Sequence, residues 1–261
     1  MNQENLFIKS TGVVICLCFG FFILVTSAPY SQASEHNPRE ILKNVDDMMR
    51  GESSTGRFTM TVNTTHWTRA LTVQFWTKED DKLLMRILSP KKERGIATLK
   101  SGRNIWNYLP NTNRVIKLPS ASLGSSWMGS HFTYDDLLKN SSLADDFDYE
   151  ITSQEKRGDL SIVEITCVPK PGVPLVWGKV DVTVNMDDNL PLLIRYYEED
   201  GMLVRTLVFT DVTGEGDRNL PKRHRMIPAG KPDEFTEVFY EKIEFDPVID
   251  ESVFSLRRLK K

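Results

Sequence analysis

Apolar and polar residues alternate along most of the chain beyond residue 55, as they do in β-strands that bury one face. Residues 180–186 show the cleanest example, with the sequence Val-Asp-Val-Thr-Val-Asn-Met, and residues 58–62 and 71–76 follow the same rule. Turn-forming residues such as Asp200-Gly201 separate consecutive runs, which is typical of hairpins. The pattern therefore predicts a mainly β protein of about eleven strands, mostly joined as antiparallel neighbours in a curved sheet or open barrel.

Three segments break this alternation and favour helix. Residues 38–50 follow a capping Asn37 and place apolar residues at helical spacing. Residues 119–145 form the longest irregular stretch, with a short helix expected at residues 134–138, and a last helical turn is expected around residues 251–256. Long irregular stretches inside compact domains are often lids or binding loops.

Several of the expected strands are apolar on both faces. Residues 83–88 are interrupted only by Arg86, and Leu192-Leu193-Ile194 carries apolar residues at both parities. In a sheet with one solvent-exposed face, apolar and polar residues should alternate along each strand. Both faces of these strands should therefore be covered, either by helices or by a concave space that holds a ligand. The alternative is a plain sandwich core with aromatic filler.

The first 33 residues have the features of a cleaved signal peptide. Lys9 precedes an almost unbroken apolar run of 13 residues, 13–25, and Ser31-Gln32-Ala33 fits the small-x-small pattern that precedes a cleavage point. A membrane crossing needs about 20 residues. We expect a signal peptide at 1–33, with an uncleaved N-terminal anchor as the alternative, followed by a single domain at 34–261.

The composition of residues 34–261 narrows the class of protein further. Their 228 residues suffice for one large β domain with a substantial core. The formal net charge of −3 does not suggest a nucleic-acid partner, which would need a clustered basic face. Cys167 is the only cysteine beyond the expected signal, so no intramolecular disulfide is expected, and its apolar neighbours predict a buried side chain. Export without disulfides suits a bacterial envelope.

No combination of residues matches a catalytic motif. The histidines are not at metal-ligand spacing, and no Gly-x-Ser-x-Gly elbow, P-loop or dinucleotide fingerprint occurs. Ser130, His131 and Asp135 could form part of a triad, and residues 135–136 or 145–146 could be paired acids, although adjacent carboxylates on a helix point in different directions. We therefore expect a protein that binds rather than catalyses, with no metal and no cofactor.

The first half of the domain contains more specific motifs. Residues 86–95 read Arg-Ile-Leu-Ser-Pro-Lys-Lys-Glu-Arg-Gly, residues 105–110 read Ile-Trp-Asn-Tyr-Leu-Pro, and residues 114–119 read Arg-Val-Ile-Lys-Leu-Pro. Trp-Met-Gly-Ser at 127–130 and Phe-Thr-Tyr-Asp-Asp-Leu at 132–137 follow. With these motifs the chain resembles the outer-membrane lipoprotein-sorting proteins, a family related to the periplasmic lipoprotein carriers of the Lol pathway. The resemblance covers nearly all of residues 34–261.

The resemblance implies a half-open, strongly curved antiparallel β-barrel with a helical lid, whose apolar cavity holds lipoprotein acyl chains. Residues 38–50 and 120–138 would then be elements of the lid. The wide apolar side chains that the resemblance suggests as cavity lining are Trp76, Met85, Ile87, Trp106, Tyr108, Trp127, Met128 and Phe132.

One departure concerns the latch of the lid. The well-known carrier of the Lol pathway has an arginine just after its second barrel strand, whereas the corresponding turn at residues 77–83 offers only Lys78 and Lys82. A lysine cannot form the forked hydrogen bonds of a guanidinium. Neither the latch nor its energy-dependent release step is carried over to this chain.

The resemblance and the residue pattern together favour a periplasmic carrier or chaperone. It would bind the acyl chains of lipoproteins or other lipids and transfer them toward the outer membrane. An inner-membrane transporter complex and an outer-membrane acceptor are the further partners that such a role implies. The alternative function is an accessory or sensor binding module of an envelope transporter or signalling complex.

Overall fold

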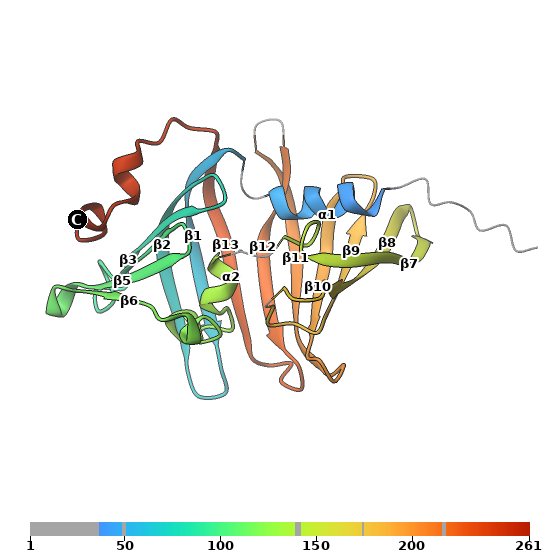
Figure 1. Cartoon of the computed structure of the whole chain (residues 1–261), viewed down its shortest axis with the longest axis horizontal. Helices are drawn as coiled ribbons and strands as arrows, with labels where there is room; N and C mark the ends of the chain where they lie inside the picture. Colours follow the sequence, from blue (N-terminus) through green and yellow to red (C-terminus); the bar gives the residue numbers. More distant parts are fainter. Residues whose placement is uncertain (1–36, 49–50, 139–141, 174, 216–217) are drawn as a thin grey trace, which may run out of the picture. The chain divides into compact units, whose positions relative to one another are not determined.

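Thirteen β-strands and a few short helices make up the computed structural model, which describes residues 37–48, 51–138, 142–173, 175–215 and 218–261 (Figure 1). The strands are β1 (Ser53–Asn63), β2 (Thr68–Lys78), β3 (Lys82–Ser89), β4 (Ala97–Ser101), β5 (Asn104–Leu109), β6 (Arg114–Lys117), β7 (Phe147–Arg157), β8 (Leu160–Pro169), β9 (Lys179–Asn185), β10 (Leu190–Tyr197), β11 (Leu203–Glu215), β12 (Arg218–Pro228) and β13 (Phe235–Phe245). The helices are α1 (Pro38–Asp47), α2 (Tyr134–Leu138) and α3 (Leu256–Leu259), with 3-10 turns η1 (Pro110–Thr112), η2 (Ser120–Ser122), η3 (Trp127–Gly129) and η4 (Glu251–Phe254).

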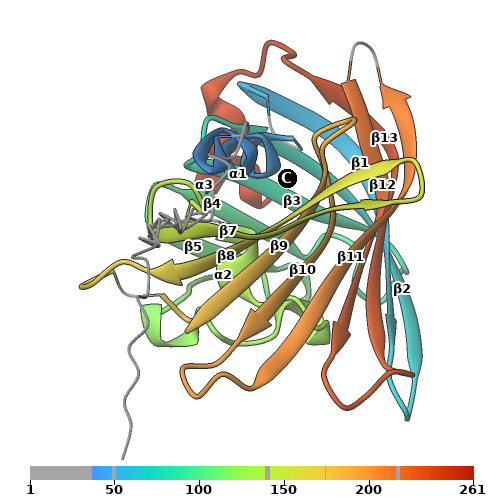
Figure 2. The same cartoon turned by 90° about the vertical axis from the view of Figure 1, so that its right-hand side faces the viewer.

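All thirteen strands belong to one antiparallel sheet, in the order β6-β5-β4-β3-β2-β1-β13-β12-β11-β10-β9-β8-β7. Almost every pair of neighbours is also adjacent in sequence, as hairpins dictate. The exception is the pair of β1 and β13, which joins the first strand to the last. β6 and β7 are the two edges, so the sheet is bent but not closed (Figure 2).

The mainly β class and the curved, unclosed antiparallel sheet with few helices agree with the sequence prediction. The number of strands is thirteen rather than about eleven. β7 carries inward-alternating Phe147, Tyr149 and Ile151 at its start, but its second half is polar and exposed. An edge strand pairs on one side only and needs less apolar surface, which is why its pattern does not predict a strand.

The sheet buries side chains on both of its faces, as the two-sided apolar runs predict. The face that carries α1 and α2, here called the inner face, holds two core clusters, one around α1 and β7–β12 and one around β1–β3, β13 and Trp127. The opposite, outer face of β3–β5 is covered by the C-terminal segment, where Phe254 and Leu259 pack against Leu84 and Leu99. The C-terminal segment therefore covers the outer face of β3–β5, and helices α1 and α2 lie on the inner face.

The expected signal peptide at 1–33 lies outside the described residues, and the described residues belong to one compact unit. Within the described part of the chain, no helix combines the length and the apolar composition that a membrane crossing requires.

Candidate functional site

A cavity of ≈ 300 Å³ lies between the inner face of the sheet, α1 and the segment that contains η3 and α2. Its volume is at the lower end of the range of about 300–1,000 Å³ that is usual for ligand pockets. The lining residues come from the sheet, from α1, from the irregular segment before α2 and from the β2–β3 turn. The apolar ones are Val45, Met48, Phe58, Met60, Phe75, Leu83, Met85, Trp127, Phe132, Leu143, Phe147, Trp177, Val180, Ile194, Tyr196, Leu207, Phe209, Met226, Val238 and Tyr240.

One wall of the cavity is an aromatic cluster on β1, β2 and β13. The ring centroids of Phe58, Phe75 and Tyr240 lie 5.7–6.0 Å from one another. The register of the sheet explains this grouping, because Phe58 is opposite Tyr240, and Phe75 is opposite Gly56, two residues before Phe58 on β1. Burial raises the pKa of Tyr240 to about 12, so its hydroxyl stays protonated at neutral pH.

The second wall comes from β10–β12. Ile194, Leu207 and Met226 point inward from three neighbouring strands. The ring of His224 packs between Phe209 and Tyr240, with centroid separations of 4.8 and 5.2 Å, and so joins the two walls. The imidazole Nε2 of His224 lies 2.9 Å from the carbonyl oxygen of Pro221.

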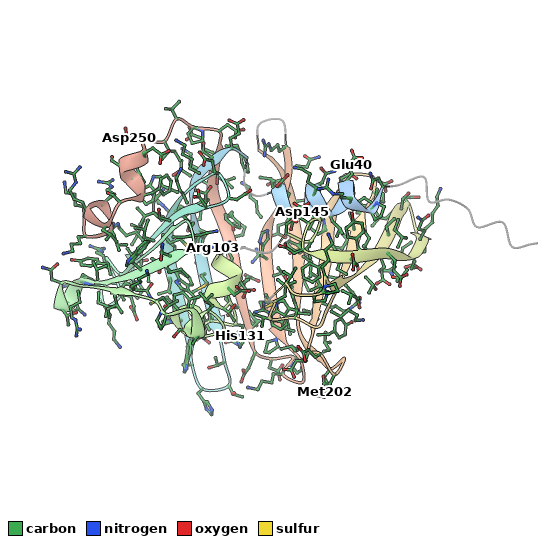
Figure 3. The ribbon with its side chains drawn as sticks, in the orientation of Figure 1. Glu40, Arg103, His131, Asp145, Met202 and Asp250 are labelled. Atoms are coloured by element: carbon green, nitrogen blue, oxygen red, sulfur yellow. The ribbon has the colours of Figure 1, made fainter. Side chains whose placement is uncertain are left out.

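Helix α1 closes the cavity over β7–β10. Asn37 caps it, because its side chain accepts a hydrogen bond from the backbone of Arg39 at 3.1 Å, and Pro38 occupies the first turn. Its apolar side buries Ile41 and Leu42 against the sheet, while Val45 reaches the cavity. An ion pair of 2.5 Å joins Arg39 to Asp145, which lies close to α1 in Figure 3.

The segment from η3 to α2 covers the other half of the cavity. Trp127 is only 2% exposed, and its indole N–H donates to the hydroxyl of Thr98 on β4 at 3.2 Å. Asn107 on β5 donates to the hydroxyl of Tyr134 at 2.7 Å. A bridge between Ser126 and Thr133 folds the segment back on itself. We call α1 and residues 120–138 together the lid, in line with the sequence expectation for residues 38–50 and 120–138.

A single arginine ties α2 to the far half of the sheet. Arg205 on β11 donates to both carboxylate oxygens of Asp136 at 2.8 and 2.5 Å, and to the carbonyl of His131 at 3.1 Å. Its guanidinium also stacks on Trp177 and Tyr196, 4.4 and 4.7 Å from the ring centroids. Arg205 therefore holds the lid through a bidentate ion pair with Asp136, and its guanidinium also stacks on two aromatic rings.

The cavity is polar at one side. Carboxylates of Asp46, Asp135 and Asp136, the β2–β3 turn residues and Lys100 line it there. The ammonium of Lys100, which is 3% exposed, donates to the carbonyl of Asp80 at 2.6 Å. Burial, with the nearby carboxylate of Asp136, raises the pKa of Asp135. The site thus combines an apolar body with a charged side, which suits an amphiphile.

The structure brings three of the eight expected lining residues to the cavity: Met85, Trp127 and Phe132. Ile87 lies on the same face of β3 and is buried in the neighbouring core cluster, and Met128 packs against that cluster. These two residues support the wall without reaching the space itself.

Trp76, Trp106 and Tyr108 lie on the outer face of the sheet, so their placement in the cavity by sequence is corrected. The register pairs Trp76 with Leu84, Leu84 with Leu99, and Leu99 with Trp106. All of these side chains belong to the cluster under the C-terminal segment. Because side chains alternate along a strand, Phe75 faces the cavity and its neighbour Trp76 cannot.

The strand pattern groups the missed lining residues on one face of the sheet, although it does not say that this face meets the cavity. Phe58, Phe75 and Met60 occupy the inward parity of β1 and β2, which the alternation of residues 58–62 and 71–76 already marks. No local signal identifies Arg205, because its partner Asp136 lies 69 residues away in sequence.

Within the described part of the chain, the ion pairs of Lys78 and Lys82 do not involve the lid. Both lysines pair with Glu251 on η4, at 2.6 Å for Lys78 and 3.3 Å for Lys82, so they fasten the C-terminal segment to the outer side of the sheet. On the same sheet half, Arg69 on β2 donates to the carbonyl of Met128 in the lid.

The residues weighed for catalysis do not form a triad. The hydroxyl of Ser130 exchanges hydrogen bonds with the backbone of Phe132, while the ring of His131 contacts Thr236 at 2.9 Å. Asp135 and Asp136 both line the cavity, where Asp136 also accepts hydrogen bonds from Arg205. Within the described ranges, no group of His, Cys, Asp and Glu could hold a metal ion.

Cys167 is a buried side chain, as expected. It is fully covered in the core under α1, and burial raises the pKa of its thiol to about 12. The thiol is therefore protonated and unreactive at neutral pH.

Solved structures that share the fold of this chain include the following three. An outer membrane lipoprotein-sorting protein domain from Vibrio parahaemolyticus is 22% identical, with a TM-score of 0.74, over 85% of this chain and 98% of that chain. A DUF1329 family protein from Desulfovibrio piger is 20% identical, with a TM-score of 0.76, over 85% and 97%. A LolA superfamily protein from Nitrosomonas europaea is 19% identical, with a TM-score of 0.70, over 84% and 98%.

Sequence comparison adds a family. The comparison with curated proteins gives no match. A family model with the description "-like: Uncharacterized protein" matches residues 79–261, which is more than half of the chain. The chain therefore belongs to the family of that model, and it has the fold of the lipoprotein-sorting and LolA superfamily structures.

Proposed function

We propose that the protein is a non-catalytic periplasmic carrier that holds the hydrocarbon part of a lipoprotein or another lipid between its bent sheet and its lid. The observation that carries the proposal is the cavity of ≈ 300 Å³, whose body is apolar and whose cover is made of separate, tied-down elements. The fold, which the chain shares with a structure described as a lipoprotein-sorting domain, supports the same role.

The free energy available from such a site is large. Burial of one methylene is worth about 0.8 kcal/mol, so a chain of about 16 carbons could gain on the order of 12 kcal/mol. A carrier that kept all of this gain would not release its cargo. We therefore propose that closure of the lid over the empty cavity competes with the cargo and offsets part of the gain.

The contacts of the lid give this competition a physical form. Arg205 holds Asp136, Trp127 is bonded to Thr98, and the backbone N–H of His131 donates to the hydroxyl of Thr236 at 2.9 Å. These bonds are all made when the lid lies on the sheet. A cargo that lifts the lid would have to break some of them, so its net affinity would be lower than its buried area suggests.

The proposed location follows from the sequence. A signal peptide at residues 1–33 would export the chain to the periplasm, where a donor at the inner membrane and an acceptor at the outer membrane would exchange cargo with it.

Lipid bound to the exported protein tests the proposal. We expect native mass spectrometry and solvent extraction to find acyl lipid in the purified protein. Leu207→Trp, which fills the cavity from β11, should lower the lipid occupancy about tenfold, since overpacking typically costs 1–3 kcal/mol. Thr210→Trp is the matched control, because Thr210 is exposed and lies on the same strand.

Lipid that is absent from the wild type, under several extraction conditions, would contradict the carrier role. Equal occupancy in the two tryptophan variants would show that lipid binds outside the cavity. Val238→Phe, on the other wall, provides a second test should Leu207→Trp fold poorly.

A further inference from the structure

Basic residues are concentrated in two segments of the sequence, although the chain as a whole has a net charge of −3. Residues 82–134 contain nine Lys and Arg and a single acid, Glu93. Residues 252–261 contain four Lys and Arg and no acid. Positive charge is therefore concentrated in two segments, although the net charge of the whole chain is small and negative.

The fold brings these two segments to the same end of the sheet. Loop 90–95, which follows β3, reaches the β5–β6 turn, since a Cβ atom built on Gly95 would lie 3.5 Å from Pro110. The C-terminal segment crosses the outer face beside them, and Arg86 on β3 donates to the carbonyl of Arg258 at 2.8 Å. The β5–β6 hairpin and the C-terminus lie at the left of Figure 1. We call residues 91–94, 114–117 and 257–261 the basic end.

The cations of the basic end are exposed. Lys91, Lys92 and Arg94 are exposed in the loop after β3, as are Arg114 and Lys117 on the edge strand β6. All four basic residues of positions 257–261 are exposed as well. Among the described residues, none of these side chains forms an ion pair. The only nearby acid in the first segment, Glu93, is 12% exposed and pairs with Arg69 at 3.7 Å.

Protection of a sheet edge explains only part of this surface. Lysine on an edge strand discourages pairing with another chain, which accounts for Lys117 on β6. It does not account for the cations of loop 90–95 or of the C-terminal segment, which do not belong to the edge. A surface rich in one sign of charge attracts a partner of the opposite sign.

Exposed apolar side chains stand among these cations. Ile116, 41% exposed, lies between Arg114 and Lys117, and Leu256, 46% exposed, precedes Arg257. The ammonium of Lys117 lies 5.9 Å from the ring centroid of Trp106. Cations interleaved with exposed aliphatic residues suit the boundary of an anionic bilayer, where charge meets headgroups and short apolar side chains enter the interface.

We propose that the basic end docks the protein on an anionic phospholipid surface. The contact uses the outer side and edge of β3–β6 with the C-terminal segment, and it leaves the cavity on the inner face free. The proposal is independent of what the cavity holds. The exposed Ile116 and Leu256 among the cations favour an anionic lipid surface over a folded acidic partner.

Vesicle co-sedimentation tests the docking surface. The protein is purified after export, and its N-terminus is established by mass spectrometry. We expect binding to vesicles that contain phosphatidylglycerol, little binding to pure phosphatidylcholine vesicles, and loss of binding when salt rises from about 0.05 M to about 0.5 M, because the Debye length shortens. Lys91→Gln/Lys92→Gln/Lys117→Gln should bind on the order of 100-fold more weakly, given the known contribution of each cation near an anionic membrane.

The matched control removes three positive charges elsewhere. Arg57, Lys156 and Lys242 are exposed and lie on β1, β7 and β13, outside the basic end. Arg57→Gln/Lys156→Gln/Lys242→Gln should bind phosphatidylglycerol vesicles like the wild type. Equal loss in both triple variants, or equal binding to both kinds of vesicle, would overturn the proposal. Salt-sensitive capture by poly-glutamate without any vesicle binding would overturn it in favour of an acidic protein partner.

Discussion

Asp135 is a half-buried carboxyl group on the polar side of the cavity. It lies on the cover, with Asp136, Arg205 and Lys100 as its charged neighbours. Burial, and then the charge of Asp136, raise its pKa above the ordinary value of 3.8. A raised pKa means that the folded protein holds the proton more tightly than the unfolded chain does.

The pH dependence of stability tests this arrangement. The contribution of Asp135 to the free energy of unfolding is fully present below pH 3.8. It is lost as the pH rises through the folded-state pKa of Asp135, because the charged form is disfavoured in the folded protein. Asp135→Asn removes the ionisation, so its stability relative to the wild type should increase as the pH rises from about 4 to about 7. Urea unfolding of both proteins at several pH values measures the difference. A constant or shrinking difference would contradict the assignment.

Individual lining residues show what a sequence can specify and what it cannot. The alternation of residues 71–76 establishes that Phe75 and Trp76 point to opposite faces. It does not say which face meets the cavity and which meets the C-terminal segment. That choice depends on Leu259 and Phe254, which pack on the outer face from more than 150 residues away in sequence. Trp76, Trp106 and Tyr108 therefore lie under the C-terminal segment and not under the lid.

The lid and the sheet are joined by several side-chain contacts, and Arg205 supplies a buried ion pair among them. Its side chain is 5% exposed and that of Asp136 is 16% exposed. Removal of one member of a buried pair leaves an uncompensated charge, which costs about 3–5 kcal/mol. The exposed pair of Arg157 and Glu155 on β7 offers a contrast, since such pairs contribute about 0–1 kcal/mol.

Arg205→Met should therefore lower the free energy of unfolding by about 3–5 kcal/mol, whereas Arg157→Met should lower it by less than about 1 kcal/mol. Urea denaturation at neutral pH gives both values. Arg205→Met/Asp136→Leu should recover much of the loss, because no charge is then left buried without a partner. A small effect of Arg205→Met, or no recovery in the double variant, would show that the pair does not hold the lid.

Local sequence patterns predict most of the helices and strands, but they do not predict every strand or every strand pairing. Hairpin turns and alternation identify β9 and β10, and the apolar spacing after Asn37 identifies α1. The break in alternation at residues 119–145 marks the lid. The second half of the edge strand β7 is polar and exposed, so the apolar alternation at its start is too short to predict the whole strand. The pairing of β1 with β13, which bends the sheet around the cavity, has no local signature at all.

The inner and outer faces of the sheet carry different features in the described unit. The inner face, with two core clusters under the lid, leaves a cavity where Phe58, Tyr240 and Leu207 converge. The outer face of β3–β5 is covered by the chain's own C-terminal segment, and the basic end lies at its margin. This division would allow a carrier to rest on a membrane with one face while the other holds cargo.

A crystal structure of the exported protein with a long-chain amphiphile tests the central claim most directly. The account predicts continuous density for the hydrocarbon chain in the cavity, in contact with Phe58, Tyr240 and Leu207, and the polar group on the side of Asp135 and Lys100. A cavity filled by the protein's own side chains, with the amphiphile bound elsewhere on the surface, would contradict it.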